Sequence, residues 1–214
     1  MWRYQIVSRD TAAKRDWRHV RPLRKKVGCL ARDCKNNLHC FRKWRPRHQS
    51  YRNGTCVECG ADLIDWGRLD KKNLKDIDYT FKSLNYEKVR KYFWDITIDK
   101  TAVNHAQKKG LEGLRVWAVN RLNRYVAAPS KELFRDGTQT PGNGRVVYYA
   151  QYATASCCRK CIEEWHGIDR NRPLTKREIN YFTELIMSYI KRKLPDLPRL
   201  AEKRSPAIPV DRQM

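Results

Sequence analysis

The sequence lacks any apolar run near the ~20 residues that a membrane-spanning helix needs. Its first residues, MWRYQIVSRDTAAKRDWRHVRPL, contain no apolar signal core. It also lacks a Gly-rich phosphate loop and a GxSxG elbow, which argues against the nucleotide-binding and hydrolase classes that those motifs mark. No strongly amphipathic basic helix favours a membrane surface as partner. We therefore expect an intracellular protein, cytoplasmic or nucleoid-associated.

Acidic residues are scarce relative to basic ones. The chain carries 46 Lys and Arg against 23 Asp and Glu, a net charge of +23, and its pI is about 9.9. Residues 1–48 alone hold 15 Lys and Arg and three Asp. Self-repulsion on this scale is costly without a polyanionic partner, so the charge predicts a basic protein that binds nucleic acid. A solvated basic surface with structural aromatics is the alternative interpretation.

The N-terminal third alternates cations with aromatic residues, as in CFRKWRPRHQSYRNG. Cations neutralise phosphates while aromatic rings stack on unpaired bases, so the pattern favours RNA binding, or DNA binding to single strands. Arginines also line the polar face of the helical pattern LEGLRVWAVNRLNRY. The candidate nucleic-acid-binding residues are Arg42, Lys43, Trp44, Arg45, Arg47, Tyr51, Arg52, Arg115, Arg121 and Arg124.

The patterns divide the chain into four segments. We predict a basic arm over 1–27, a zinc-ribbon-like module over 28–69, a helical domain with a second cysteine cluster over 70–195, and a Pro-rich tail over 196–214. The predicted fold is mainly α with a small β element, with zinc-ribbon or treble-clef-like knuckles and flexible basic termini.

Spacings of three and four between apolar residues predict helices through most of 70–127, with a break at Gly110. CIEEWHGI reads as a short helix capped by Gly167, and Thr175 with Glu178 forms a capping box that opens a helix to about Leu194. The β-prone run RVVYYAQYA predicts a strand, and Asn53-Gly54 predicts a hairpin between two short strands.

Eight cysteines in a reducing compartment indicate metal ligands before disulfides. The first cluster reads Cys29-x4-Cys34-x4-His39-Cys40-x15-Cys56-x2-Cys59, and Gly60 permits the tight turn of a zinc knuckle after Cys59. The other two ligands come from the upstream residues of the cluster. Free buried cysteines are the alternative. The preferred set for this first site is Cys34, Cys40, Cys56 and Cys59, with Cys29 as an alternate ligand.

The second cluster lies in YYAQYATASCCRKCIEEWHGI, where a knuckle opens a short helix whose N-terminal amides favour thiolates. The predicted ligands of this second site are Cys157, Cys158, Cys161 and His166. Completion by Cys29, completion by the remote His105, and simple packing of the sulfurs against Trp165 stay open. One or two zinc ions are expected, and an iron–sulfur cluster is the poorer match.

The residues for catalysis are less well marked. A nucleic-acid hydrolase needs acidic groups converging with a histidine, and the weak candidates are Asp65, His105 and His166. A Cys nucleophile in the second cluster, with His166 as its base, is a further reading. No spacing matches a catalytic motif, so a nuclease or base-acting enzyme is an alternative to a binding protein. A structural subunit of a nucleoprotein complex, with protein partners, is another.

The second cluster carries a resemblance to a known family. The block resembles a bacterial domain family of unknown function, number 4186, which is marked by Cys-Cys-Arg-x-Cys followed by Trp-His-Gly. The resemblance implies that the block is one unit, with a match reaching back to about Cys56, but no activity. Relatives often have His where this chain has Tyr152, so a role of that His would be absent here. The matching residues are Ala153, Thr154, Ala155, Cys157, Cys158, Arg159, Cys161, Trp165, His166 and Gly167.

Overall fold

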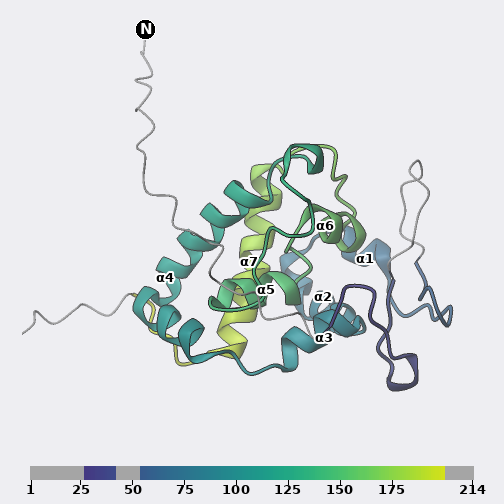
Figure 1. The fold of residues 1–214 in the computed structure, drawn as a ribbon, viewed down its shortest axis with the longest axis horizontal. Coiled ribbons are helices and arrows are strands. Elements are labelled where there is room, and N and C mark those ends of the chain that lie inside the picture. Colours follow the sequence, from purple (N-terminus) through teal and green to yellow (C-terminus); the bar gives the residue numbers. More distant parts are fainter. Residues whose placement is uncertain (1–26, 42–53, 201–214) are drawn as a thin grey trace, which may run out of the picture.

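A computed structural model describes residues 27–41 and 54–200. The described chain is mainly helical, as predicted, and none of its helices is long and apolar enough to cross a bilayer. Figure 1 shows α5 and α7 near the centre, α4 along one side, and the N-terminal cysteine segment beside α1, α2 and α3 on the other. The helices are α1 (Trp66–Asp70), α2 (Ile77–Leu84), α3 (Lys88–Asp95), α4 (Lys100–Tyr125), α5 (Val146–Ala153), α6 (Arg159–His166) and α7 (Lys176–Lys193), with 3-10 turns η2 (Cys34–Asn36), η3 (Leu74–Asp76) and η4 (Ser130–Glu132).

The predicted strand RVVYYAQYA is wrong, because this run forms α5. The helix packs against α3, α4 and α7, and nearly all of its residues are buried. A short continuous apolar run has the same pattern in a buried helix as in a buried strand, so the neighbours decide between them. In the described part of the chain, β pairing is limited to bridges between Asp33 and Leu38 and between His39 and Glu87. Most of the predicted hairpin around Asn53 lies outside the described residues.

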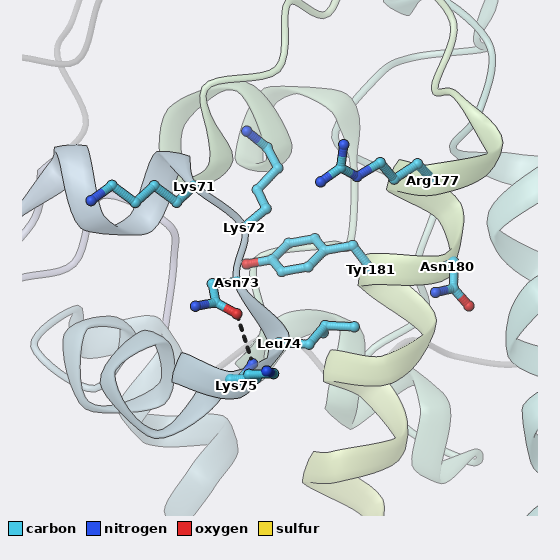
Figure 2. Close-up of a pocket in the computed structure, with 8 residues that line it drawn as sticks. All are labelled: Lys71, Lys72, Asn73, Leu74, Lys75, Arg177, Asn180 and Tyr181. Carbon is cyan, nitrogen blue, oxygen red and sulfur yellow. Dashed lines mark hydrogen bonds between the residues drawn. The ribbon is translucent and has the colours of Figure 1, made fainter.

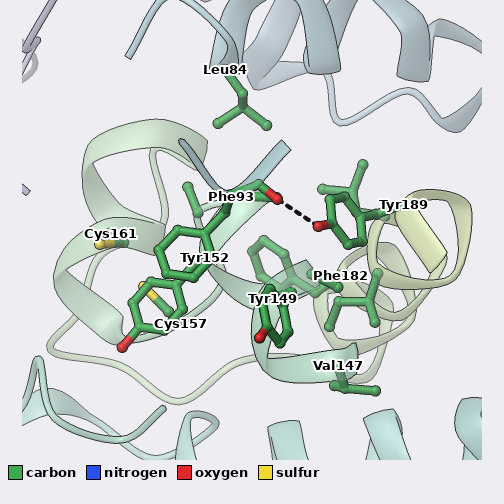
Figure 3. Close-up of a cluster of buried hydrophobic side chains, with 14 of the residues drawn as sticks. Leu84, Phe93, Val147, Tyr149, Tyr152, Cys157, Cys161, Phe182 and Tyr189 are labelled. Atoms are coloured by element: carbon green, nitrogen blue, oxygen red, sulfur yellow. Dashed lines mark hydrogen bonds between the residues drawn. The ribbon is translucent and has the colours of Figure 1, made fainter. Parts of the chain in front are cut away.

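Aromatic side chains fill the space around α5 (Figure 3). The rings of Phe93 and Tyr152 stack with centroids 4.4 Å apart, and the hydroxyl of Tyr189 donates a 2.6 Å hydrogen bond to the carbonyl of Phe93. One continuous buried cluster extends from Phe41 to Leu197. The cysteine-rich segments therefore share the core of the helical domain.

The break predicted at Gly110 is present. Gly110 divides α4 with φ 62° and ψ 173°, a backbone conformation open essentially to glycine alone. The amides just beyond the break bond to the C-terminal segment, Leu111 N to Pro198 O at 2.9 Å and Glu112 N to Arg199 O at 3.0 Å. The beginning of the Pro-rich tail thus packs on α4, and the remainder of the tail lies outside the described residues.

The predicted helix caps are also present. Gly167 ends α6 in the left-handed conformation, with φ 62°. Thr175 and Glu178 form both hydrogen bonds of the capping box that opens α7. These caps set where α6 ends and α7 begins. A short link joins the two helices, and α7 then runs through the centre of the molecule (Figure 1).

Candidate metal centres and a basic pocket

Three thiols and one imidazole meet in the N-terminal cysteine segment. The sulfurs of Cys34, Cys56 and Cys59 and one ring nitrogen of His39 all lie within 4.8 Å of one another. The Cys34 and Cys56 sulfurs are 3.8 Å apart, and the Cys59 sulfur is 3.4 Å from His39 Nδ1. Tetrahedral zinc places two sulfurs about 3.8 Å apart and sulfur and nitrogen about 3.6 Å apart. A disulfide would need about 2.05 Å. This first cluster therefore has the spacing of ligands that share one cation.

The knuckle around Cys56 is built to carry a thiolate. Gly60 donates to Cys56 O at 2.9 Å, Cys56 N donates to Ala61 O at 2.9 Å, and Gly60 adopts φ 72°. Burial raises the pKa of Cys56, but backbone hydrogen bonds at Cys59, Cys40 and Glu58 outweigh it and lower that pKa to about 6. The chain thus favours the ionised form that a metal needs.

His39 takes the place in the first cluster that we expected for Cys40. Its Nε2 lies 2.9 Å from Asn37 Oδ1 and donates to it, so the lone pair of Nδ1 faces the sulfurs. Asn37 tolerates the left-handed conformation (φ 56°) that turns its side chain to this position. Neighbouring side chains of an extended segment point to opposite sides. Cys40 accordingly points away, with its sulfur 3.7 Å from the carbonyl of Cys29.

The second cluster joins the sulfurs of Cys157, Cys158 and Cys161, which lie within 4.8 Å of one another. Cys158 is the N-cap of α6 and Cys161 lies one turn on, so both sulfurs lie on one side of the first turn. Hydrogen bonds from Cys157, Cys158 and Cys29 hold the pKa of Cys161 well below its usual range, and Arg90 adds to this effect.

Arg90, a residue of α3, is fully buried against the second cluster. Its Nη2 lies 3.2 Å from the sulfur of Cys161 and its Nη1 3.9 Å from that of Cys157, while Nη1 also donates to Tyr152 O at 2.9 Å. Its Nε donates to Glu87 Oε2 at 2.8 Å, and the same oxygen accepts from Trp165 Nε1 at 2.8 Å. The cation therefore lies between one carboxylate and the sulfurs of Cys157 and Cys161.

The two clusters are linked through the residues around Glu87. His39 N donates to Tyr86 O at 2.7 Å and Lys88 N donates to His39 O at 3.3 Å, so the first cluster is attached to the chain that also positions Glu87 and Arg90. The rings of Phe41, Trp66 and Trp165 form an aromatic cluster beside this link, with centroids 5.4 to 5.8 Å apart. The N-terminal segment is thereby packed against α1 and α6.

His166, which we expected as a ligand of the second site, has other neighbours. Its Nε2 lies 3.0 Å from Thr154 O and its Nδ1 3.5 Å from the hydroxyl of Tyr181. A residue five positions after Cys161 is rotated about 140° around a helix, which turns it toward α7 and away from the sulfurs. Interaction with Cys161 and burial raise the pKa of Cys29, but the sulfur of Cys29 is not among those that lie within 4.8 Å of one another in the second cluster. Both clusters could hold a metal ion such as zinc.

The three candidate catalytic residues have structural surroundings of their own. Asp65 caps α1 by accepting a hydrogen bond from Arg68 N at 2.9 Å. His105 packs edge-on against Trp117, and burial, with Arg145 nearby, lowers its pKa. His166 lies in the core between α6 and α7 as described. The described residues thus offer these side chains no arrangement typical of a hydrolase.

The predicted nucleic-acid-binding residues divide into three groups. Those from Arg42 to Arg52 lie outside the described residues. Arg121 is buried: its Nε donates to Gln151 at 2.9 Å and its guanidinium lies over the ring of Tyr148. Arg115 pairs with Glu184 through both of its terminal nitrogens. Arg124 alone of the described candidates remains exposed without an ion pair among the described residues. The polar face of α4 therefore presents fewer unpaired arginines than the sequence pattern predicted.

A basic pocket that we did not predict lies between the turn after α1 and the first turns of α7 (Figure 2). Its volume is about 530 Å³, within the range of small-ligand sites. The pocket has no acidic residue in its lining. The neighbouring Glu178 is held by two hydrogen bonds from Arg172. The run KKNLK was visible in the sequence, but its apposition to Arg177 depends on the fold. The lining residues are Lys71, Lys72, Asn73, Leu74, Lys75, Arg177, Asn180 and Tyr181.

Comparison with known protein families gives one match, to a domain of unknown function (DUF4186), over residues 78–191. The matched region covers more than half of the chain, and the chain belongs to this family. It begins in α2 and ends in α7, so it includes Arg90 and the sulfurs Cys157, Cys158 and Cys161 but not the first cluster. It therefore begins later than Cys56, where we expected it. No solved structure matches the chain.

Proposed function

We propose that this protein is a zinc-stabilised nucleic-acid-binding protein that prefers RNA or single-stranded DNA. The observation that carries the proposal is the basic pocket, which gathers four cations (Lys71, Lys72, Lys75 and Arg177) with no acidic residue in its lining. Repulsion between like charges that are held close together destabilises the folded protein unless an anion neutralises them. A phosphodiester chain supplies such an anion.

The first cluster supports the zinc part of the proposal. Its set of three thiols and one imidazole is typical of structural zinc, and the Cys34–Cys56 separation of 3.8 Å equals the edge expected of the tetrahedron. An iron–sulfur cluster would hold its cysteines further apart, because the cluster itself separates them. Zinc would also hold together a segment that has little aliphatic core of its own.

Zinc in the first cluster would also fix both ends of the basic segment, residues 42–53. This segment carries five Lys and Arg residues together with Trp44 and Tyr51. The candidate ligands His39 and Cys56 flank it in the chain, so one ion would hold its two ends together. The residues 1–26, 42–53 and 201–214 carry 17 Lys and Arg against four Asp and Glu. Metal and nucleic-acid binding are therefore expected to be coupled through this segment.

The test measures binding of the zinc-loaded protein to labelled single-stranded DNA, RNA and duplex across a salt series. We expect the logarithm of affinity to fall linearly with the logarithm of salt, with a slope of about −0.7 per phosphate contact for single strands. Replacing Lys71, Lys75 and Arg177 together by Gln should reduce the magnitude of the slope by about 2. Binding that is absent, or indifferent to salt, would contradict the proposal.

A charge-matched control separates the pocket from net charge. Lys108, Lys109 and Lys131 are exposed on the surface away from the pocket lining. Replacing these three by Gln removes the same charge and should change the salt slope less than the pocket variant does. Equal effects of the two variants would show that net charge, and not the pocket, directs binding.

A further inference from the structure

We propose that the basic pocket recognises a terminal phosphate group, so that the protein binds the phosphorylated end of a nucleic-acid strand in preference to its interior. The inference rests on the proposed function and names the part of the strand that this pocket takes. A terminal phosphate is a monoester that carries roughly −1.5 to −2 charge at pH 7 and offers three strong acceptor oxygens. An internal phosphodiester carries a single negative charge.

The lining of the basic pocket suits the terminal group. Four cations border one space of about 530 Å³, a volume typical of sites that enclose one small ligand. Figure 2 shows the side chains of Lys72 and Arg177 ending on the same side of the ring of Tyr181. The side-chain oxygen of Asn73 already accepts a hydrogen bond from Lys75 N at 3.0 Å. The lining is therefore rich in donors, and it fits a ligand that is rich in acceptors.

Acidic groups lie at one side of the basic pocket. A smaller pocket of about 270 Å³ adjoins it, shares Lys72 and Arg177 with it, and is also lined by Asp70 and Glu178. Arg172 offsets part of the Glu178 charge. A strand that continued past the cations in this direction would still bring its next phosphate toward two carboxylates, and like charges repel. A strand that ends in the basic pocket avoids this repulsion.

The backbone of the pocket has a cost that an anionic ligand would explain. Lys72 adopts the left-handed conformation, with φ 49°, which favours glycine. It lies in the turn after α1, where its amide donates to Leu69 O at 3.0 Å, and it lines both pockets. Glycine would relieve this strain but would remove a cation from the pocket. Strain of this kind is concentrated at ligand sites.

The experiment measures the affinity of the zinc-loaded protein for one single-stranded sequence, made as RNA and as DNA, with a 5′-phosphate, a 3′-phosphate or only hydroxyl ends. A circular strand of the same length has no end and is the fourth probe. We expect one of the phosphorylated strands to bind at least about tenfold tighter than the hydroxyl-ended and circular strands, which lack the charge-assisted hydrogen bonds to a terminal phosphate. Asp70→Asn should bring the affinity for the circular strand closer to that for the phosphorylated one.

Lys72→Gly separates binding from stability. The variant relieves the left-handed strain, so its thermal midpoint should be unchanged or higher, while the preference for the phosphorylated end should fall at least about threefold. Arg135→Gly is the matched control. Arg135 also has a left-handed backbone, with φ 48°, and it is exposed and outside the pocket lining. This control removes the same charge and should keep the full preference.

The outcomes separate the inference from the proposed function. Equal binding of the phosphorylated, hydroxyl-ended and circular strands would refute end recognition while the proposed function stands. An equal loss of preference in Lys72→Gly and Arg135→Gly would show that overall charge, and not this pocket, recognises the end. Failure of every strand to bind would contradict the proposed function itself.

Discussion

Replacing Arg90 by Met should lower the free energy of unfolding by about 3–5 kcal/mol, because it would leave the Glu87 carboxylate buried without its cation. Both side chains are almost completely inaccessible, at 1% and 2% exposed. Burial raises the pKa of Glu87, while Arg90 and Trp165 act against this shift. After the substitution, Trp165 Nε1, at 2.8 Å, would be the remaining donor identified for Glu87 Oε2.

The size of the loss follows from the contacts that Arg90 makes. Its guanidinium contacts the Glu87 carboxylate, the Tyr152 carbonyl and the sulfurs of Cys157 and Cys161. A loss of this size would be a large fraction of the 5–15 kcal/mol by which a typical domain is stable. Exposed ion pairs contribute about 0–1 kcal/mol. Arg115→Met, at the partly exposed pair with Glu184, is therefore the control and should cost about 1 kcal/mol or less.

The assay is urea unfolding of zinc-saturated protein, followed by tryptophan fluorescence, for Arg90→Met, Glu87→Gln and the double variant. The double variant should cost about 1–3 kcal/mol less than the sum of the singles, since each single leaves the other group unpaired. Zinc content is measured in every sample, because Arg90 also contacts the second cluster. Additive losses, or an Arg90→Met loss no larger than that of Arg115→Met, would refute this reasoning.

Two further substitutions test the backbone and the helix caps. Gly110→Ala should destabilise the fold by about 1–3 kcal/mol, since φ 62° and ψ 173° suit glycine alone; Gly113→Ala in the regular part of α4 should be neutral or stabilising, and equal thermal denaturation shifts for the two would contradict this account. Glu178→Gln should cost about 1 kcal/mol at pH 7, because hydrogen bonds from Arg172 and Thr175 lower the pKa of Glu178 to about 2. A lowered carboxyl pKa stabilises the fold above the unfolded value near 4.3, and this contribution disappears as the pH falls toward 2. Unfolding curves of the two proteins should therefore converge between pH 4 and pH 2, and a difference that persists at pH 2 would argue against the ion pair.

Much of the helical architecture could be predicted because its signals are local. The break at Gly110, the cap at Gly167 and the capping box at Thr175 each depend on residues within one or two turns. The strand predicted for RVVYYAQYA was wrong because the structure of this run depends on its tertiary neighbours and not on a local signal. β-branched and aromatic residues favour strands when one face is exposed, but α5 is enclosed by α3, α4 and α7.

The two candidate metal sites show the same contrast between local and tertiary signals. The knuckle pairs Cys56 with Cys59 and Cys158 with Cys161 were evident from spacing, because three-residue separations place both sulfurs on one side of a turn. The choice of His39 over Cys40 depends on which way an extended segment faces and on what lies across from it. Neighbouring residues in such a segment point to opposite sides, so spacing alone cannot choose between them.

The sequence by itself determined that this chain is strongly basic, mainly helical and equipped with two groups of closely spaced cysteines. Only the tertiary structure decided which cysteines meet, that Arg90 lies buried against them, that Arg121 is a core residue, and that Lys71, Lys72 and Lys75 line one pocket together with Arg177. Composition and short-range periodicity are properties of the chain, whereas these contacts join residues dozens of positions apart. Their formation depends on how the helices pack around α5, which no local pattern encodes.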